Sequence, residues 1–237
     1  MGLEVKEVTV DFGGHRALDT VTIDAPDGVV TGLIGPNGAG KTTLFNVVTG
    51  VQRCLRGHVE VNGVRLDGMA LHRRARLGLG RTFQRLELFG SLTVRENIRM
   101  AAAMHPRHER ESVTQAVIER LDLTAVADTR ADLISTGTGR VVELGRCLAT
   151  DAKVVLLDEP ASGQDLHESE RFALILRELA GSGTAVLLVE HDMDLVMRVC
   201  DRIYVLDFGV VLASGTPNDI RANAVVRSAY LGEEATA

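Results

Sequence analysis

The sequence predicts an α/β fold in which a parallel sheet is covered by helices and carries two additions. Three observations support this fold. Short apolar runs alternate with amphipathic segments, two alternating runs stand close together near the N-terminus, and a long block with helical spacing interrupts the chain. Such alternation is typical of a sheet with covering helices. We expect one domain over residues 1–237: a core of residues 1–84 and 150–237 that includes an antiparallel β-subdomain, and an inserted helical subdomain of about residues 85–149.

The first part of the chain predicts strands and one helix. Val5–Phe12 and Leu18–Ile23 alternate in polarity around a pair of glycines, which is typical of a hairpin. Val29–Ile34 is mostly apolar and β-branched, so it predicts a buried strand, and a helix follows to about Gly50. His58–Asn62 predicts another strand, which is expected to end where Asn62 and the glycine after it form a turn dipeptide.

The middle of the chain is predicted to be helical from about Arg95 to Asp128 and again over Arg140–Ala149. Helical spacing supports the first of these segments. Its expected stripe consists of Val113, Ala116, Val117, Arg120 and Leu121.

The last part returns to alternating strands and helices. The predicted strands are Val154–Asp158 and Ala185–Val189, and the predicted helices are Glu168–Leu179 and Asp192–Cys200. A hairpin of Ile203–Leu206 and Val210–Leu212 is expected to close the sheet.

Residues 35–42 read Gly-Pro-Asn-Gly-Ala-Gly-Lys-Thr, which has the form G-x-x-x-x-G-K-[ST] between a predicted strand and a predicted helix. In such a loop, glycines let backbone N–H groups approach phosphate oxygens, and the helix points its positive end at the same anion. Lys41 can reach the terminal phosphates and the Thr42 hydroxyl can bind Mg²⁺. The candidate nucleotide-binding residues are Gly35, Pro36, Asn37, Gly38, Ala39, Gly40, Lys41, Thr42 and Thr43.

Acidic residues follow the strand Val154–Asp158 directly. Ligands in α/β folds bind at the carboxyl ends of strands, so Asp158 can hold Mg²⁺ and Glu159 can polarise an attacking water. His191 follows the next predicted strand and can reach a γ-phosphate from there. The sequence therefore predicts a P-loop nucleotide site that also binds Mg²⁺; the resemblance given below implies that the nucleotide is ATP.

Composition excludes several other classes of protein. The chain is 45% hydrophobic with a net charge of −6, which does not favour nucleic acid as a partner. Its three cysteines are far apart and lack metal-ligand spacing, so a reducing cytosol is expected. The first residues do not resemble a signal peptide, and no apolar stretch approaches the ~20 residues of a membrane span. If the protein serves a membrane, another chain or segment must cross it.

Together, these motifs resemble those of an ATP-binding-cassette (ABC) ATPase over essentially the whole chain. Gly35–Thr42 matches the Walker A loop, and Val154–Asp158 with Glu159 and Pro160 matches Walker B and the catalytic glutamate. Gln84 matches the Q-loop glutamine, and Ile134-Ser135-Thr136-Gly137-Thr138 aligns with the signature Leu-Ser-Gly-Gly-Gln. Asp165 matches the D-loop aspartate, and His191 matches the switch histidine. Phe12 falls near the aromatic residue that stacks on adenine.

The resemblance implies a head-to-tail dimer with two ATP molecules at its interface. Glu159 would orient or deprotonate the attacking water, His191 would contact the γ-phosphate, and Gln84 would report to a membrane partner. The expected Mg²⁺ ligands are Thr42, Gln84 and Asp158. The residues expected to act on the ATP of the other subunit are Ser135, Gly137, Thr138 and Asp165.

A closer resemblance is to the ATPase subunits of branched-chain amino-acid importers. It rests on Gly32–Gly35 with Leu44–Asn46, Gly80–Gln84, Val189–Asp194 and Ala229–Glu233. The ATPase subunits of urea and amide importers share many of these residues, so urea and amides are the alternative substrate class. The implied protein is peripheral at the cytoplasmic face of the inner membrane. Its implied partners are permease subunits, a second ATPase subunit of the same or another chain and, indirectly, a solute-binding protein.

Two departures from the family pattern affect the expected activity. Thr138 stands where the signature has glutamine, and Gln164 stands where leucine is common. Loss of one glutamine hydrogen bond costs about 1 kcal/mol, so we expect a weakened site that still works. If the second ATPase subunit is a different chain, one composite site could be slow and the other active.

Three other functions fit less of the sequence. A cassette protein acting on DNA or ribosomes usually has two cassettes or a long coiled coil, and this chain has neither. A non-hydrolysing regulatory subunit is favoured only by Thr138, and a small-molecule kinase does not explain the signature, Asp165 and His191 together. The three apolar residues after Gln84 are either contacts of a permease helix or ordinary core: Leu86, Leu88 and Phe89.

Overall fold

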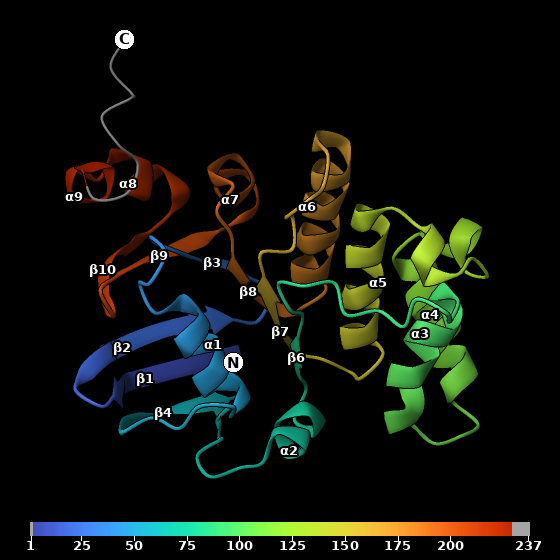
Figure 1. The fold of residues 1–237 in the computed structure, drawn as a ribbon, viewed down its shortest axis with the longest axis horizontal. Helices are drawn as coiled ribbons and strands as arrows, with labels where there is room; N and C mark the ends of the chain where they lie inside the picture. The colour runs from blue at the N-terminus through green and yellow to red at the C-terminus, as the bar shows by residue number, and fades with distance from the viewer. Residues whose placement is uncertain (1, 229–237) are drawn as a thin grey trace.

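The computed structural model describes residues 2–228 and contains two sheets (Figure 1). The smaller sheet has four antiparallel strands in the order β2-β1-β4-β5. These strands are β1 (Gly2–Phe12), β2 (His15–Pro26), β4 (Arg56–Val61) and β5 (Val64–Arg65). The predicted β-subdomain and its first hairpin are therefore confirmed.

The larger sheet has six strands in the order β10-β9-β3-β8-β7-β6. Five of them run parallel, and β10 pairs antiparallel with β9. The strands are β3 (Val30–Ile34), β6 (Leu79–Arg81), β7 (Val154–Asp158), β8 (Ala185–Val189), β9 (Arg202–Asp207) and β10 (Val210–Gly215). The three central strands β3, β7 and β8 are buried on both faces, which explains their continuous apolar sequences.

Two cores lie on opposite faces of this sheet. Val154 and Leu156 of β7 pack toward the smaller sheet and α1 (Lys41–Thr49), whereas Val155 and Leu157 pack toward the helices on the other face. This alternation follows from the period of two in a strand. The helices of the second face are α5 (Thr136–Leu148), α6 (Leu166–Gly181), α7 (Met193–Val199), α8 (Pro217–Ala222) and α9 (Ala224–Val226). Figure 1 shows the helices above the sheet and the β-subdomain below it.

The helical block is divided where the sequence predicted one continuous segment. Helix α3 (Val94–Ala101) is followed by a 3₁₀ turn, and α4 (Arg110–Arg120) begins only after Pro106. Proline lacks the N–H that a helix needs, so the helix cannot continue there. Short 3₁₀ turns at Thr124–Val126 and Ala131–Leu133 connect α4 to α5.

The predicted stripe of α4 was wrong in part. The buried positions are Thr114, Val117 and Ile118, followed by Leu121, whereas Ala116 and Arg120 are exposed. This set keeps the helical spacing but turns the buried face so that it includes the large side chain of Ile118. Packing against α3 and α5 therefore decided the face.

The remaining helices differ from prediction mainly at their ends. Helix α5 begins four residues before the predicted Arg140, because Ser135 caps it by accepting a hydrogen bond from the N–H of Thr138. A short helix, α2 (Leu71–Arg76), precedes β6. The limits of the helical subdomain at residues 85 and 149 stay a prediction. The segment at residues 229–233 lies outside the described residues.

Candidate nucleotide site

The loop between β3 and α1 needs glycine at two positions. Gly35 has φ 151°, and a Cβ there would lie 1.9 Å from the carbonyl oxygen of Leu206. Gly40 has φ 108°, and its Cβ would lie 2.7 Å from the carbonyl oxygen of Ala17. No other residue adopts this backbone without strain or collision. Gly38 also has positive φ but faces open space, so its backbone stays accessible to a ligand.

Lys41 lies at the start of α1 and is only 7% exposed. Its ammonium donates to the carbonyl oxygens of Gly35, at 2.5 Å, and Pro36, at 2.9 Å. Burial lowers the pKa of Lys41, whereas the carboxylates of Glu159 and Asp158 raise it. The Lys41 ammonium is therefore bound within the loop by neutral carbonyl oxygens.

A cavity of about 280 Å³ lies over this loop. The loop and the start of α1 form one wall, the β1–β2 hairpin forms a second, and the ends of β7 and β8 form a third. Phe12 is half-exposed at the hairpin wall, where its ring can stack on a base. Glu159 and His191 reach the cavity from the third wall. The structure therefore brings together the predicted Walker A, adenine-stacking and catalytic residues.

Glu159 is held between the other two predicted catalytic residues. Gln84 Nε2 donates to Glu159 Oε2 at 2.9 Å, and His191 Nε2 lies 3.0 Å from Glu159 Oε1. Glu159 also has φ 49°, a left-handed conformation that costs a non-glycine residue about 1–2 kcal/mol. Its N–H donates to the carbonyl oxygen of Val189, which fixes this strained turn. The arrangement aims one carboxylate at the cavity and leaves it bonded on both oxygens.

Asp158 lies one residue earlier and is not among the residues that line the cavity. Its Oδ2 accepts a hydrogen bond from Arg81 Nη2 at 3.1 Å, and both side chains are 10% exposed. Arg81 also donates to Asn46 Oδ1 at 2.8 Å, which ties β6 and β7 to α1. Sequence reasoning missed Arg81, although it stands three residues before Gln84.

The predicted signature residues lie away from this cavity and contact one another. Ser135 Oγ lies 2.6 Å from Glu168 Oε1, and a Cβ on Gly137 would lie 2.3 Å from the carboxyl carbon of Glu168. Asp165 caps α6 in a reciprocal capping box with the same Glu168. Glu168 was missed by sequence reasoning, although its spacing from Asp165 is that of a capping box. Thr136, at the first glycine of the signature, is a further departure that was missed.

Glu190 is another missed residue, buried at the end of β8 with 4% exposure. Its carboxylate accepts from the N–H of Ala161 at 2.7 Å and from the N–H of His191 at 3.0 Å. Burial raises its pKa more than these hydrogen bonds lower it. Glu190 therefore connects the segment before Asp165 to the backbone of His191.

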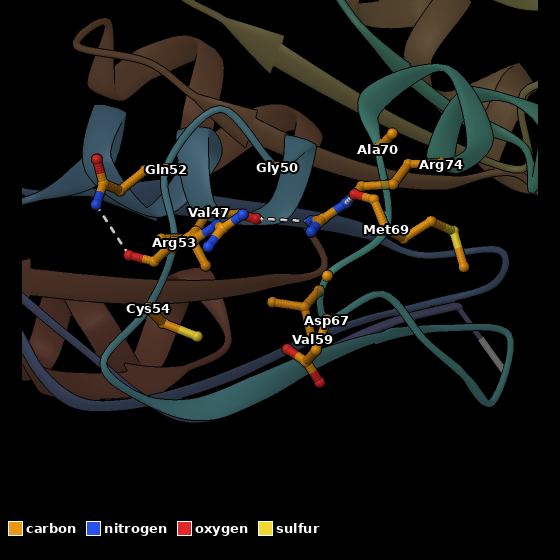
Figure 2. A pocket seen from close by; sticks show the side chains of 11 residues that line it. Val47, Gly50, Gln52, Arg53, Cys54, Val59, Asp67, Met69, Ala70 and Arg74 are labelled. Carbon is orange, nitrogen blue, oxygen red and sulfur yellow. Dashed lines mark hydrogen bonds between the residues drawn. The ribbon is translucent and has the colours of Figure 1, made fainter.

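A larger cavity of about 460 Å³ lies at the opposite end of α1 and contains none of the predicted site residues (Figure 2). Arg74 lies along its wall and donates to the carbonyl oxygens of Val47, at 2.8 Å, and Val48, at 2.7 Å. These are terminal carbonyls of a helix, so the guanidinium caps the negative end of α1. Cavity size alone would have pointed to the wrong end of this helix.

The phosphate loop and the strand-end carboxylates over a parallel sheet define a P-loop nucleotide site. The family model described as ABC transporter matches residues 18–162. A model described as Branched-chain amino acid ATP-binding cassette transporter matches residues 210–236. The chain belongs to the ABC transporter family and is an ATPase of that family.

Similarity to individual relatives extends over nearly the whole chain. The high-affinity branched-chain amino acid transport ATP-binding protein BraF of Pseudomonas aeruginosa is 39% identical over 98% of both chains. The protein LivG of Escherichia coli, with the same description, is 37% identical over 98% of both chains. These identities confirm the resemblance to branched-chain importer ATPases.

Solved structures confirm the fold. A nucleotide-free ATP-binding cassette from an ABC transporter superimposes with a TM-score of 0.87 at 28% identity, over 98% of this chain and 99% of that chain. An ABC transporter cassette in its ADP conformation gives a TM-score of 0.88 at 29% identity, over 98% of both chains.

Proposed function

We propose that this chain hydrolyses ATP to drive an importer of branched-chain or related amino acids. The observation that carries the proposal is the position of Glu159, which faces the phosphate-loop cavity between Gln84 and His191. The amino-acid substrate is supported by the names of the relatives that cover the whole chain. The alternative substrate class is urea or amides.

The donor set fits Mg²⁺ bound together with ATP phosphates. No group of three or more His, Cys, Asp or Glu residues that could hold a metal occurs within residues 2–228. Mg²⁺ does not need such a cage, because it usually takes one or two protein oxygens and completes its shell with phosphates and water. Thr42 would supply a hydroxyl, and Asp158 and Gln84 would supply oxygens directly or through water. When bound, the ion would neutralise charge on the phosphates.

Residues of the same subunit would perform the cleavage step. The loop amides and Lys41 would bind the phosphates, while Glu159 would take a proton from, or orient, the attacking water. His191 would contact the γ-phosphate and hold Glu159 in place through their 3.0 Å contact. General-base catalysis of this kind contributes about 10²–10⁴-fold to the rate.

A second subunit would complete the site. Within one subunit, Ser135, Gly137 and Thr138 do not line the cavity. Cleaving a triphosphate requires donors on several sides of the transferred group, and one loop cannot surround it. We infer that these residues, with Asp165, act on ATP held by the other subunit of a head-to-tail dimer.

The membrane-spanning part of the importer would be separate permease subunits, with this chain peripheral at the cytoplasmic face. None of the helices described in residues 2–228 is long and apolar enough to span a membrane. A groove of about 260 Å³ beside the Q-loop would receive a permease helix, and Phe83 and Glu87 line it. Leu86 and Phe89 are exposed and suit such a contact, whereas Leu88 packs against the core.

The test is the Mg²⁺-dependent ATPase rate as a function of protein concentration, for the wild type and Glu159→Gln. A rate that rises faster than linearly and is abolished in the variant supports a composite site formed by self-dimerisation. Glu170→Gln is the matched control, because Glu170 is an exposed glutamate of α6 outside the cavity. Near-normal turnover in Glu159→Gln would contradict the proposal. Bound ATP without turnover at any concentration would mean that the chain needs a different ATPase partner or its permease.

The substrate is tested separately in vesicles that contain the complete importer. ATP-dependent uptake of leucine, isoleucine or valine is expected, and uptake of urea or short amides in their place would assign the alternative class.

A further inference from the structure

We propose that Arg140 and Glu143 of α5 are positioning residues for hydrolysis. They hold the backbone of the loop from Phe83 to Glu87 against α5, so that the Gln84 side chain meets Glu159. This inference rests on the proposed roles of Gln84 and Glu159. It concerns two buried charges, two and five residues beyond the signature, which the site described above does not use.

Arg140 contacts the backbone directly at Gln84. Its Nη2 donates to the carbonyl oxygen of Gln84 at 2.5 Å, and its Nη1 donates to that of Phe83 at 2.9 Å. The Arg140 side chain is only 5% exposed, so these bonds are shielded from water. A planar guanidinium can hold two neighbouring carbonyls at once, which a lysine ammonium does not do in the same geometry.

Glu143 holds the other end of the same loop. Its Oε1 accepts from the N–H of Glu87 at 2.6 Å, and its Oε2 pairs with Arg140 Nη1 at 3.0 Å. Burial raises the pKa of Glu143, whereas the Glu87 N–H and Arg140 lower it. A buried ion pair is weak evidence for stability, because desolvation offsets most of its attraction. Here the pair clamps both ends of one loop, which gives it a role other than stability.

Packing strengthens this connection at Gly139. A Cβ on Gly139 would lie 2.9 Å from Leu86 Cδ2, so the absence of a side chain lets the Q-loop lie close against α5. Leu86 stands between the two segments that Arg140 and Glu143 hold. The loop from Phe83 to Glu87 therefore lies against α5 at Gly139, Arg140 and Glu143.

A direct chain of contacts runs from the signature to the catalytic carboxylate. Ser135 caps α5, Arg140 on the same helix holds the Gln84 carbonyl, and the Gln84 side chain donates to Glu159 at 2.9 Å. A displacement of α5, which the proposed dimer would produce at the signature, would move Gln84 relative to Glu159. Arg140 would thus connect the half-site that acts on one ATP to the half-site that hydrolyses the other.

A double-mutant cycle tests whether Arg140 acts through Gln84. Arg140→Lys is expected to lower kcat by about fivefold or more and to change KM for ATP by less than about twofold, because the phosphate loop is untouched. In a Gln84→Ala background, the same substitution is expected to change kcat by less than about twofold. Arg74→Lys is the matched control, since Arg74 is also buried and bonds backbone carbonyls, but at the far end of α1.

The outcomes separate this inference from the proposed function. Equal losses from Arg140→Lys in both backgrounds, with Gln84→Ala itself strongly impaired, would overturn the inference and leave the function intact. An unchanged kcat in Gln84→Ala would overturn the role of Gln84 and the inference with it. If Arg140→Lys does not fold, Glu143→Gln serves in the same cycle, because it keeps an acceptor for the Glu87 N–H.

A second readout is independent of turnover. The side-chain amide of Gln84 gives an NMR signal that reports its bond to Glu159, and the chain has four glutamines to distinguish. Glu159→Ala supplies the position of the unbonded amide. We expect Arg140→Lys to move the signal toward that position and Arg74→Lys to leave it in place. An unmoved signal in Arg140→Lys would overturn the inference.

Discussion

The phosphate-loop region and the signature region both carry groups suited to an anion, but they hold these groups differently. At the phosphate loop, the Lys41 ammonium is bonded to neutral carbonyls, and an open cavity of about 280 Å³ lies beside it. At the signature, Ser135 contacts the charged carboxylate of Glu168, which also fills the space against Gly137. A phosphate can replace a neutral carbonyl easily, whereas an anionic side chain opposes its approach.

This difference suggests an order in which the two half-sites bind the nucleotide. The phosphate-loop region is arranged to bind nucleotide within one subunit. If the signature region acts on a phosphate as proposed, Glu168 must first leave Ser135 and Gly137. We therefore expect nucleotide binding to precede dimerisation, and changes in the two regions to affect different measurements.

Glu159→Gln gives the largest expected effect and changes only the phosphate-loop cavity. The substitution removes the proposed general base but keeps side-chain size, so turnover should fall by about 10²–10⁴-fold. ATP binding should persist, because Lys41 and the loop glycines are unchanged. Analytical ultracentrifugation with ATP should then show a stable dimer that is absent with ADP. A variant that stays monomeric at every ATP concentration would contradict an interface made by two copies of this chain.

Lys41→Met should weaken nucleotide binding in the monomer. A hydrogen bond to a charged group contributes about 1.5–3 kcal/mol, which corresponds to about 10- to 150-fold in Kd. Titration with a fluorescent ATP analogue at low protein concentration measures this directly. Lys153→Met is the control, because Lys153 is an exposed lysine outside the cavity. Unchanged affinity would mean that the phosphates do not contact Lys41.

Gly137→Ala should impair the signature region without affecting nucleotide binding by the monomer. Its Cβ would lie 2.3 Å from the carboxyl carbon of Glu168, so that flexible side chain must move and lose its contact with Ser135. The added methyl also blocks close approach of a phosphate, and we expect the ATPase rate to fall by about tenfold or more. Gly181→Ala is the control, because its Cβ meets open space. A Gly137→Ala variant with weaker monomer binding and normal dimer activity would reverse the assignment of the two regions.

The two regions also differ in how far the sequence could predict them. The sequence could predict that the phosphate loop, Glu159 and His191 line one cavity, because each follows a buried strand and parallel strands end at one edge of a sheet. Their roles stay predictions. The contact between Gln84 and Glu159 was not predicted, and the structure alone shows it. The strands of the fold could also be predicted, because alternating polarity and continuous apolar runs are visible in neighbouring residues of the sequence.

Contacts between distant residues could not be predicted in this way. Arg140 meets a carbonyl 57 positions away, and Ser135 meets a carboxylate 33 positions away. No periodicity encodes such a pair, because Arg140 and Glu168 are locally ordinary charged residues on helices and their partners lie in distant segments. The shifted face of α4 has the same cause: helical spacing was visible, but the neighbours that select the buried face lie in other segments.

Thr138→Gln gives the smallest expected effect and restores the usual signature residue. Ser135 Oγ lies 3.1 Å from Thr138 Oγ1 and 2.6 Å from Glu168 Oε1, yet a serine hydroxyl donates to one acceptor at a time. Glutamine would remove the Thr138 acceptor and offer its own amide, for a gain of about 1 kcal/mol or less than tenfold in dimer affinity or ATPase rate. Thr124→Gln, at an exposed threonine of a 3₁₀ turn, is the control. A fall in activity would mean that Thr138 is adapted to its own partner surface, and that the second subunit is a different chain whose phosphate loop matches it.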